Sequence, residues 1–373
     1  MTNRRILVTG GAGFVGSHTA DALLALGHEV RVFDNISSQV HPHGRPSYLS
    51  VDVEFVQGDI RNLSAVSSAL DGIDAVYHLA AMVGVGQSMY EIADYTATNI
   101  LGTANLLQSI LDQGCKVEKL IVASSMSIYG EGRYSCPNCG PTAPRVRDLD
   151  QLKESRWELN CANCGSNLLP LPTDESKPLE CSSIYALSKK AQEEMALVFG
   201  ATYGVPTVAL RYFNIYGPRQ ALSNPYTGVA AIFASRLMNG NPPIIFEDGR
   251  QMRDFVNIRD IVQANILALE SSAANGMALN VGSGSPVSVL QVATGIAEML
   301  GVQIPFHVSG RYRAGDIRHC FADISHTSQV LGYSPAVSFH DGTSELVEWL
   351  KSQQAHDRTE EALGHLSAHG LVA

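Results

Sequence analysis

The chain has 373 residues, which is long enough to bury a sizeable core in one large domain or in two. Hydrophobic residues make up 45% and charged residues 17%, and no run approaches the roughly 18 apolar residues that a membrane helix requires. The formal net charge of −10 disfavours nucleic acid and anionic membranes as partners, because both require a basic footprint.

Short runs rich in Val, Ile and Leu alternate with helical patterns along the first half of the chain. Residues 13–27, 94–114 and 182–204 have apolar residues at helical spacing and end in glycine. The expected strands are 4–10, 28–33, 53–59, 74–81, 119–125 and 206–214. This alternation predicts a Rossmann-type α/β fold, with a doubly wound parallel sheet.

The remaining segments mix strands and helices less regularly, which predicts a smaller second lobe. We expect the dinucleotide-binding domain at 1–212, interrupted by an insertion at 131–178. The second lobe is expected at 213–350, with the chain crossing back to the sheet near 254–282. Residues 351–373 are predicted to form a tail with few contacts to the rest of the chain.

A glycine-rich stretch, TGGAGFVG, lies directly after the first expected strand and opens the first expected helix. Gly11, Gly13 and Gly16 form G-x-G-x-x-G, a pattern in which the backbone can approach a pyrophosphate at a helix N-terminus. Asp34 ends the second strand, where a carboxylate can bind a ribose diol and would repel a 2′-phosphate. The combination favours NAD over NADP.

A second motif, YALSK, places Tyr185 and Lys189 four residues apart and so on one face of a helix. A nearby ammonium stabilises a phenolate and lowers the tyrosine pKa, which makes the tyrosine usable as a base. A surface Tyr and Lys is the ordinary interpretation of such a pair. The glycine motif and the serine-rich strand end at 124–127 make the catalytic interpretation the better one.

Four of the seven cysteines form two C-x-x-C pairs, CPNC and CANC, each followed by glycine. Cys136, Cys139, Cys161 and Cys164 have the spacing of a closed tetrahedral zinc site, which is structural rather than catalytic. Iron or two local disulfides are the alternatives. The metal-like pattern and three scattered cysteines indicate a reducing compartment, the cytoplasm.

These motifs resemble the extended short-chain dehydrogenase/reductase family, in the branch that modifies nucleotide sugars. The similarity covers Ile6 to Trp349 apart from the insertion, and includes HLAAMVGVGQS, TNILGTANLL, ASSMSIYG, LRYFNIYGPRQ, GRQMRDFVNIRD and GDIRHCFADI. It implies a catalytic triad of Ser125, Tyr185 and Lys189, and a homodimer that pairs the helices containing Asn99 and Tyr185.

The resemblance also implies the binding residues. The cofactor contacts it implies are Gly10, Gly13, Phe14, Val15, Gly16, Asp34, Asn35, Asp59, Ile60, Leu79, Ala80, Ala81, Asn99, Ser124, Tyr185 and Lys189. The substrate contacts it implies are Ser125, Asn214, Arg219, Arg253, Arg313 and Arg318, with the arginines neutralising the diphosphate.

Met126 and Ser127 follow Ser125, where dehydratases of this family carry an acidic pair and decarboxylases usually keep a glutamate. Neither side chain can do acid–base work, so the resemblance implies an NAD-dependent nucleotide-sugar 4-epimerase. The stretch AAMVGVGQSMYEI and the cysteine-paired insertion are most similar to dTDP-L-rhamnose 4-epimerases. A UDP-hexose or UDP-hexuronate 4-epimerase, a dehydrogenase or ketoreductase, and a non-catalytic NAD-binding regulator remain alternatives.

The insertion leaves the chain after Ser125 and returns before Tyr185. We therefore expect the metal to brace a loop that forms a wall or lid over the sugar, or packs on a neighbouring subunit.

Overall fold

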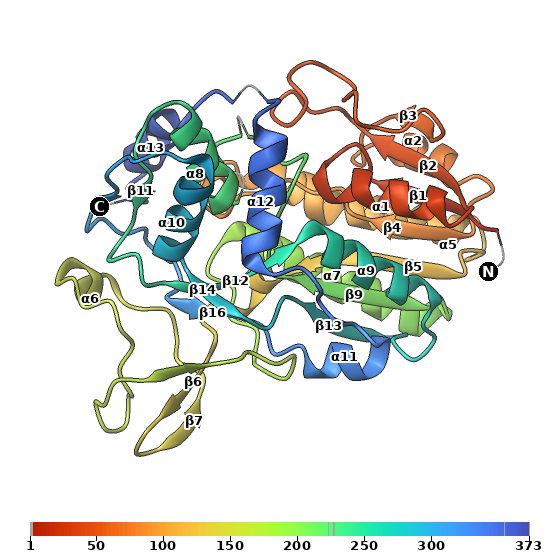
Figure 1. The fold of residues 1–373 in the computed structure, drawn as a ribbon. Coiled ribbons are helices and arrows are strands. Elements are labelled where there is room, and N and C mark those ends of the chain that lie inside the picture. The colour runs from red at the N-terminus through yellow and green to blue at the C-terminus, as the bar shows by residue number, and fades with distance from the viewer. Residues whose placement is uncertain (1–2, 223, 227, 354, 373) are drawn as a thin grey trace.

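A parallel sheet of seven strands forms the centre of the molecule, in the order β13-β9-β5-β4-β1-β2-β3 (Figure 1). The computed structural model describes residues 3–222, 224–226, 228–353 and 355–372. The strands are β1 (Arg5–Thr9), β2 (Glu29–Asp34), β3 (Glu54–Gln57), β4 (Ala75–His78), β5 (Lys119–Ser125), β9 (Thr207–Tyr212) and β13 (Met277–Val281). The strand order reverses between β1 and β4, and at such a point the loops at the carboxyl ends separate and leave room for a ligand.

Helices cover both faces of the sheet, as the alternation of strands and helices predicts. On one face α1 (Phe14–Ala25), α9 (Ile258–Glu270) and α11 (Ser325–Leu331) share a core cluster with the strands. On the other face lie α2 (Leu63–Ala69), α5 (Gly102–Asp112) and α7 (Ile184–Tyr203). The expected Rossmann-type α/β class is therefore confirmed.

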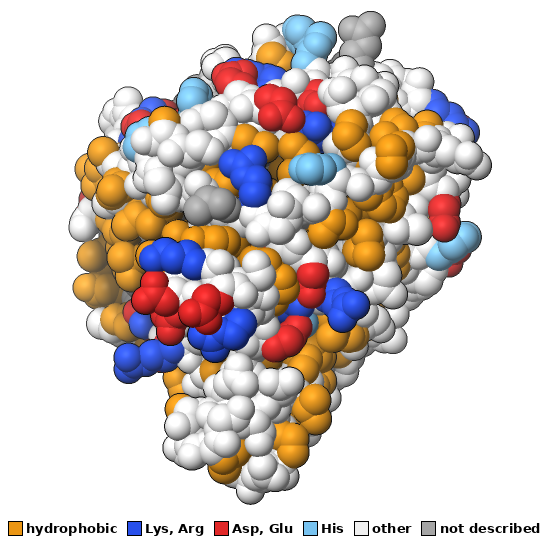
Figure 2. All heavy atoms as spheres, turned by 90° about the vertical axis from the view of Figure 1, so that its left-hand side faces the viewer, with side chains coloured by type: hydrophobic (Ala, Val, Ile, Leu, Met, Phe, Trp, Pro, Cys, Tyr) orange, Lys and Arg blue, Asp and Glu red, His pale blue; other side chains and the backbone are white. Residues whose placement is uncertain are grey.

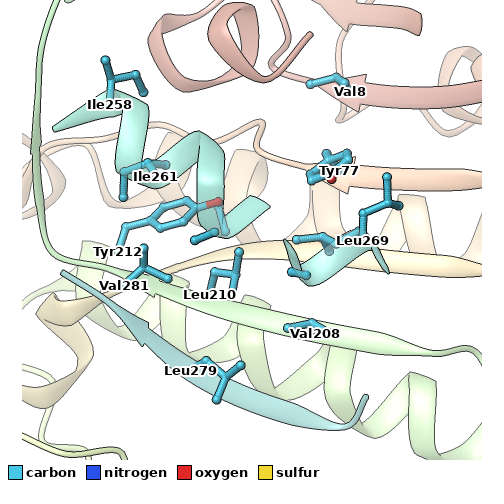
Figure 3. Packing of buried hydrophobic residues seen from close by; sticks show 14 of the residues in the cluster. Val8, Tyr77, Val208, Leu210, Tyr212, Ile258, Ile261, Leu269, Leu279 and Val281 are labelled. Carbon is cyan, nitrogen blue, oxygen red and sulfur yellow. The ribbon is translucent and has the colours of Figure 1, made fainter. Parts of the chain in front are cut away.

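Figure 3 shows how the first face is packed. Ile261 and Leu269 of α9 lie in one buried cluster with Val208 and Leu210 of the sheet, and all four are at most 3% exposed. Each such side chain contributes about 1.5–3 kcal/mol by leaving water. This packing holds the strand ends, and so the site above them, in fixed positions.

A second lobe is built around a smaller sheet of four strands. The strands are β10 (Asn214–Tyr216), β12 (Met252–Asn257), β14 (Pro286–Ser288) and β16 (His319–Cys320). Helices α8 (Val229–Met238), α10 (Val289–Leu300) and α12 (Phe339–Leu350) pack into its core, and β11 (Ile244–Ile245) pairs with β15 (His307–Val308). Helix α9 and strand β13 carry the chain back to the large sheet.

The insertion is a separate small unit at the lower left of Figure 1. Its three-stranded antiparallel sheet has the order β7-β6-β8. The elements are β6 (Arg133–Cys136), β7 (Gly140–Thr142), α6 (Leu149–Lys153) and β8 (Leu169–Leu171).

On the face of the molecule that Figure 2 presents, acidic and basic side chains are intermixed and form no continuous basic stripe.

The C-terminal segment differs from the weakly held tail that the sequence predicts. It contains α13 (Thr359–Ala368), which buries Leu363 and Leu366 against Tyr90 and Phe246. The segment packs on the rest of the protein because its few apolar residues lie on one helix face.

Four short helices complete the chain: α3 (Val85–Ser88), α4 (Ile92–Tyr95), the π-helix η1 (Thr96–Leu101) and the 3₁₀-helix η2 (Met126–Tyr129). None of the described helices is long and apolar enough to cross a membrane.

Candidate functional site

A pocket of about 790 Å³ lies above the carboxyl ends of the large sheet and extends to the second lobe. This volume is within the usual range for ligand sites. Its floor comes from the β1–α1 turn and from the ends of β2, β4 and β5, and its far wall from β10, α8, β12 and α13.

The glycine turn forms a cradle that side chains would fill. Gly10 has φ +67°, and a Cβ there would lie 2.8 Å from the backbone nitrogen of Ala80. A Cβ on Gly16 would lie 2.3 Å from the carbonyl oxygen of Gly10. Gly13 is the N-cap of α1 and lines the pocket, as do Phe14 and Val15. The N–H groups of a helix N-terminus suit a pyrophosphate.

Asp34 stands at the end of β2 and lines the same pocket. Its carboxylate accepts hydrogen bonds from the backbone N–H groups of Ala12 (3.1 Å) and Ile36 (2.9 Å), which fix its orientation. Asn35 also lines the pocket. The carboxylate is therefore placed where a ribose diol can reach it.

Asp59 lies beside the pocket lining rather than in it, although its neighbour Ile60 is part of the lining. Arg61 lies 2.7 Å from the Asp59 carboxylate, and this hydrogen bond lowers the pKa of Asp59 to about 2. Asn35 donates a further hydrogen bond to it (3.3 Å). The arrangement fits a role in orienting Asn35 and Arg61 more than a direct contact to the cofactor.

The loop after β4 carries Leu79, Ala80 and Ala81 into the pocket. Asn99 is fully buried on η1 and does not reach the pocket lining. Its side chain binds both backbone groups of Met82, at 2.8 and 3.1 Å, and donates to the hydroxyl of Ser188 (2.9 Å). Asn99 therefore holds the loop against α7 instead of touching a ligand.

Ser125, Tyr185 and Lys189 all line the pocket. Ser125 ends β5, and its Oγ accepts hydrogen bonds from the backbone N–H (3.2 Å) and the hydroxyl (2.9 Å) of Ser127. Tyr185 is the second residue of α7, and its backbone N–H donates to the Ser88 hydroxyl (3.0 Å). Lys189 follows Tyr185 by one helix turn and lies on the same face of α7. The end of β5 and the start of α7 therefore bring Ser125, Tyr185 and Lys189 together.

The pKa of Tyr185 differs from the expectation. Burial raises it, and the Ser125 hydroxyl only partly opposes that rise. Burial also lowers the pKa of Lys189 to about 7, so the ammonium is a weak source of positive charge here. Lowering of the tyrosine pKa therefore requires a further positive charge in the pocket.

A buried ion pair beneath these residues was not apparent from the sequence. Arg211 of β9 lies 2.6 Å from Glu193 of α7, and Ser124 donates to the same carboxylate at 2.6 Å. Glu193 follows Lys189 by four residues, so helical periodicity alone places it on the same face. The pair locks α7 to β5 and β9.

Besides Ser125, three of the expected substrate residues line the pocket: Asn214, Arg253 and Arg313. The side-chain oxygen of Asn214 is buried and has no hydrogen-bond partner among the residues that the structure describes, so a ligand can donate to it. Arg313 pairs with Asp316 at 2.7 Å, and Arg253 lies 3.5 Å from the same carboxylate. Two guanidinium groups therefore meet at one edge of the pocket.

Arg219 and Arg318 do not line the pocket, in contrast to the expectation. Arg219 pairs with Asp21 at 2.7 Å and lies over the ring of Tyr48. The side chain of Arg318 is fully buried, with Glu247 and Asp248 within 2.9 Å, so its charge is already neutralised. Arg318 cannot bind a diphosphate without leaving these partners, and Arg219 contacts groups that lie outside the pocket lining.

The second lobe and α13 add an apolar wall that the sequence did not indicate. It comprises Phe233, Phe246, Leu363, Leu366 and Leu371. These positions have no motif of their own and come together only through the packing of α8, β11 and α13.

The four paired cysteines form one cluster at the end of the insertion. Their sulfur atoms all lie within 4.8 Å of one another, and Cys136 Sγ is 3.4 Å from Cys164 Sγ. Thiolates around a tetrahedral zinc with Zn–S of about 2.3 Å lie roughly 3.8 Å apart, so the donor set fits that ion. Gly140 and Gly165 have positive φ (83° and 75°), which closes each turn behind its second cysteine.

The insertion does not form a wall of the pocket, which was one of the two arrangements expected for it. Among the described lining residues, none comes from 131–178. The insertion contacts the second lobe at Glu247 and within 316–319 instead.

A sequence model of the NAD dependent epimerase/dehydratase family matches residues 6–146 and 164–282. The chain belongs to this family. The expected family and the expected enzyme class, an NAD-dependent epimerase, are therefore confirmed.

Relatives of this epimerase-family chain cover nearly all of its length. It is 34% identical to a dTDP-L-rhamnose 4-epimerase of Burkholderia thailandensis, over 94% of this chain and 96% of the relative. The crystal structure of UDP-glucose 4-epimerase of Thermotoga maritima with UDP-glucose superposes with a TM-score of 0.76, at 31% identity, over 93% of this chain and 98% of that chain. UDP-glucuronic acid 4-epimerase of Bacillus cereus, in complex with UDP-glucuronic acid and NAD, has a TM-score of 0.75 at 28% identity, over 93% and 99%.

His78, at the end of β4 in this epimerase-family chain, is expected to make the free energy of unfolding of the cofactor-free protein depend on pH in the acid range. Its ring lies between the hydroxyls of Thr9 (2.9 Å) and Thr103 (3.0 Å), and burial lowers its pKa from 6.5 to about 3, helped by Lys189. Between these two pH values the unfolded chain binds more protons at His78 than the folded protein. The free energy of unfolding should therefore fall as the pH drops from 6.5 towards 3, by up to about 1.4 kcal/mol per pH unit from this group.

His78→Gln should make this fall shallower, as measured by urea unfolding at pH 7, 6, 5 and 4 without cofactor. His43→Gln is the matched control, because His43 is exposed. An unchanged slope in His78→Gln would show that other groups cause the acid sensitivity.

Proposed function

We propose that this chain is a nucleotide-sugar 4-epimerase that inverts C4 through a transient 4-keto intermediate, with dTDP-L-rhamnose as substrate and dTDP-6-deoxy-L-talose as product. The observation that carries the proposal is the group of Ser125, Tyr185 and Lys189 beside a dinucleotide cradle, without an acidic side chain next to Ser125.

The neighbours of Ser125 favour epimerisation over elimination. Removing water across C5 and C6 requires an acid and a base at those carbons. Met126 cannot supply a proton, and the Ser127 hydroxyl is engaged with Ser125 at 2.9 Å. Asp316, which also lines the pocket, is paired with Arg313. Next to Ser125 the pocket therefore carries no acid–base pair for elimination, and Tyr185 is the group placed there for proton transfer.

Bound NAD⁺ supplies a hydride acceptor for C4 and returns the hydride to the opposite face of the ring, so the net redox change is zero. Tyr185 takes the proton of the 4-hydroxyl and later gives it back. Ser125 holds the oxygen at C4 through its own hydroxyl. Lys189 holds the ribose next to the nicotinamide, and the positive charge of the oxidised cofactor offsets the effect of burial on the tyrosine pKa.

The binding groups divide between the two lobes. We assign the pyrophosphate of NAD to the turn of Gly10, Gly13 and Gly16, and its adenine ribose to Asp34, which disfavours NADP. We assign the substrate diphosphate to Arg253 and Arg313. The side-chain oxygen of Asn214 accepts a hydrogen bond from the nucleotide sugar. Anchoring the diphosphate allows the sugar ring to turn over between the two hydride transfers.

The choice of dTDP-L-rhamnose is supported by the relative that is 34% identical and by the apolar lining. A 6-deoxy sugar carries a methyl group, and Met82, Val83, Met126 and Phe213 offer apolar contacts. A UDP-hexose or UDP-hexuronate 4-epimerase is the rival, because solved structures of such enzymes are similar at 31% and 28% identity. The intact triad disfavours a non-catalytic regulator, which would not need these three residues. A dehydrogenase differs from an epimerase because it would consume NAD in proportion to substrate.

We further propose that Cys136, Cys139, Cys161 and Cys164 hold a structural zinc ion, because four thiolates leave no position open for a reactant. The seven cysteines are free thiols in the structure, which fits a reducing compartment such as the cytoplasm. A homodimer through η1 and α7 is supported by the exposed side chains of Leu101 and Leu187 on these helices.

The test is a panel of purified substrates. The protein is offered dTDP-L-rhamnose, UDP-glucose and UDP-glucuronate, and the products are resolved by NMR. The expected result is a C4 epimer of dTDP-L-rhamnose without added reductant. An epimer of a UDP-sugar alone would replace the proposed substrate, and no epimer from any of them would overturn the proposed reaction.

A further inference from the structure

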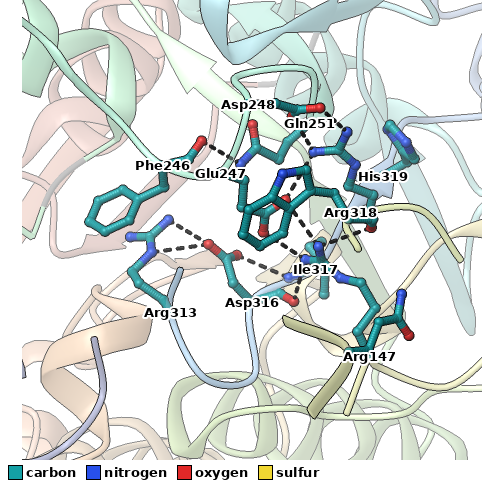
Figure 4. A network of polar contacts seen from close by, with 12 residues as sticks. Arg147, Phe246, Glu247, Asp248, Gln251, Arg313, Asp316, Ile317, Arg318 and His319 are labelled. Atoms are coloured by element: carbon teal, nitrogen blue, oxygen red, sulfur yellow. Dashed lines mark hydrogen bonds and ion pairs between the residues drawn. The ribbon is translucent and has the colours of Figure 1, made fainter. Parts of the chain in front are cut away.

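The insertion joins the body of the protein through a buried network of charges around residues 313–319 (Figure 4). Arg147 of the insertion donates to the carboxylate of Glu247 through both terminal nitrogens, at 2.9 and 2.8 Å. It also donates to the carbonyl oxygen of Asp316 at 3.2 Å. The side chains of Arg147 and Glu247 are at most 2% exposed. The insertion therefore contacts the backbone of this loop directly.

Asp316 connects that backbone to the arginines of the pocket. Its carboxylate accepts from Arg313 at 3.0 and 2.7 Å and lies 3.5 Å from Arg253. Arg253 in turn donates to the carbonyl oxygens of Ile317 (2.7 Å) and Arg318 (2.9 Å). Any displacement of the loop would therefore move both guanidinium groups.

A second connection runs from the cysteine cluster to the same loop. Glu131 accepts hydrogen bonds from the backbone N–H groups of Arg318 (2.6 Å) and His319 (3.3 Å). The hydroxyl of Tyr134 donates to the same carboxylate at 2.9 Å. Tyr134 packs in one apolar cluster with Cys136 and Cys161, together with Leu159 and Leu168. Five buried residues make a small core, and such a unit needs a cross-link to stay ordered.

We infer that the cysteine-braced insertion is the positioning element for Arg253 and Arg313, and that Arg147, Glu131 and Tyr134 act through loop 313–319 to set the affinity for the diphosphate of the substrate. The inference rests on the proposed function, because it requires these two arginines to bind that diphosphate. It assigns the insertion an effect on substrate affinity and none on the proton and hydride steps at C4.

The test measures diphosphate binding in variants that keep the metal ligands. Arg147→Lys retains the charge but lacks the fork that reaches Glu247 and Asp316 together. Tyr134→Phe removes only the hydroxyl that donates to Glu131. The matched controls are Arg156→Lys, whose side chain is 60% exposed in the same insertion, and Tyr333→Phe, which removes a buried hydroxyl that bonds Gly282 elsewhere.

Calorimetry with dTDP and UDP, and with thymidine and uridine as probes that lack phosphate, gives the decisive comparison. Arg147→Lys and Tyr134→Phe should each weaken binding of the preferred nucleoside diphosphate by about tenfold, a typical coupling between sites. Nucleoside binding, metal content and bound NAD should stay at the wild-type level, and KM for the sugar nucleotide should rise while kcat is kept. A merely structural role would weaken nucleoside and nucleotide alike.

Unchanged diphosphate affinity in both variants, or an equal loss for the nucleosides, would overturn the inference and leave the proposed function intact. Wild-type protein that binds neither dTDP nor UDP would instead overturn the proposed function. If Arg147→Lys fails to fold, Tyr134→Phe decides the question alone.

Discussion

Tyr185→Phe should lower kcat by roughly 10²- to 10⁴-fold, the usual contribution of a positioned general base. The ring remains in its buried place at the start of α7, so the cradle of Gly10, Gly13 and Gly16 is untouched and bound NAD should be retained. Turnover is measured by NMR on the preferred sugar nucleotide. Cofactor content is measured on the nucleotide released by denaturation.

The matched control is Tyr203→Phe on the same helix, whose side chain is exposed and lies outside the pocket lining. It should keep wild-type kcat. Wild-type turnover in Tyr185→Phe would refute the assignment of the base, whereas loss of NAD together with activity would show that the tyrosine mainly holds the cofactor.

Cys136→Ser combined with Cys139→Ser should remove the metal and unfold the insertion locally. Structural zinc contributes about 10 kcal/mol or more to the folding of small zinc domains, and the five-residue core of the insertion cannot replace that contribution. We expect loss of zinc by elemental analysis, a lower melting temperature and new protease cleavage within 131–178.

Cys115→Ser is the control for that double variant, because Cys115 is not part of the four-cysteine cluster and has no cysteine partner at ligand spacing. It should keep both metal and melting temperature. Metal-free wild-type protein, or a double variant with unchanged melting and proteolysis, would contradict a structural metal site.

The sequence predicted best those features that lie in contiguous segments. Each strand–helix unit of the large sheet carries its own apolar pattern, and Gly10 to Gly16 and Tyr185 to Lys189 lie within single motifs. The cysteine cluster was predictable for the same reason, since two short C-x-x-C turns define it. The structure brings these groups to the ends of neighbouring strands, as the order of the elements requires.

Long-range pairing is the part that the sequence could not predict. Arg318 looked like a ligand for phosphate, but Glu158 and Glu247, which lie 160 and 71 residues away along the chain, neutralise it in the interior. Arg147 and Glu247 are 100 residues apart, so nothing local indicated that the insertion docks on the second lobe. In the same way α13 becomes part of the pocket wall only because its apolar face meets residues from β11 and the loop at Tyr90.

The most direct test of the proposed reaction is the fate of the hydrogen at C4. dTDP-L-rhamnose deuterated at C4 is incubated with the purified protein in ordinary water, and both epimers are analysed by NMR and mass spectrometry. A 4-epimerase that transfers the hydride to bound NAD⁺ and back should give an epimer that keeps deuterium at C4, with no free NADH. Loss of the label to solvent, a 4-keto-sugar as the final product, or NADH formed in proportion to substrate would contradict the proposed function.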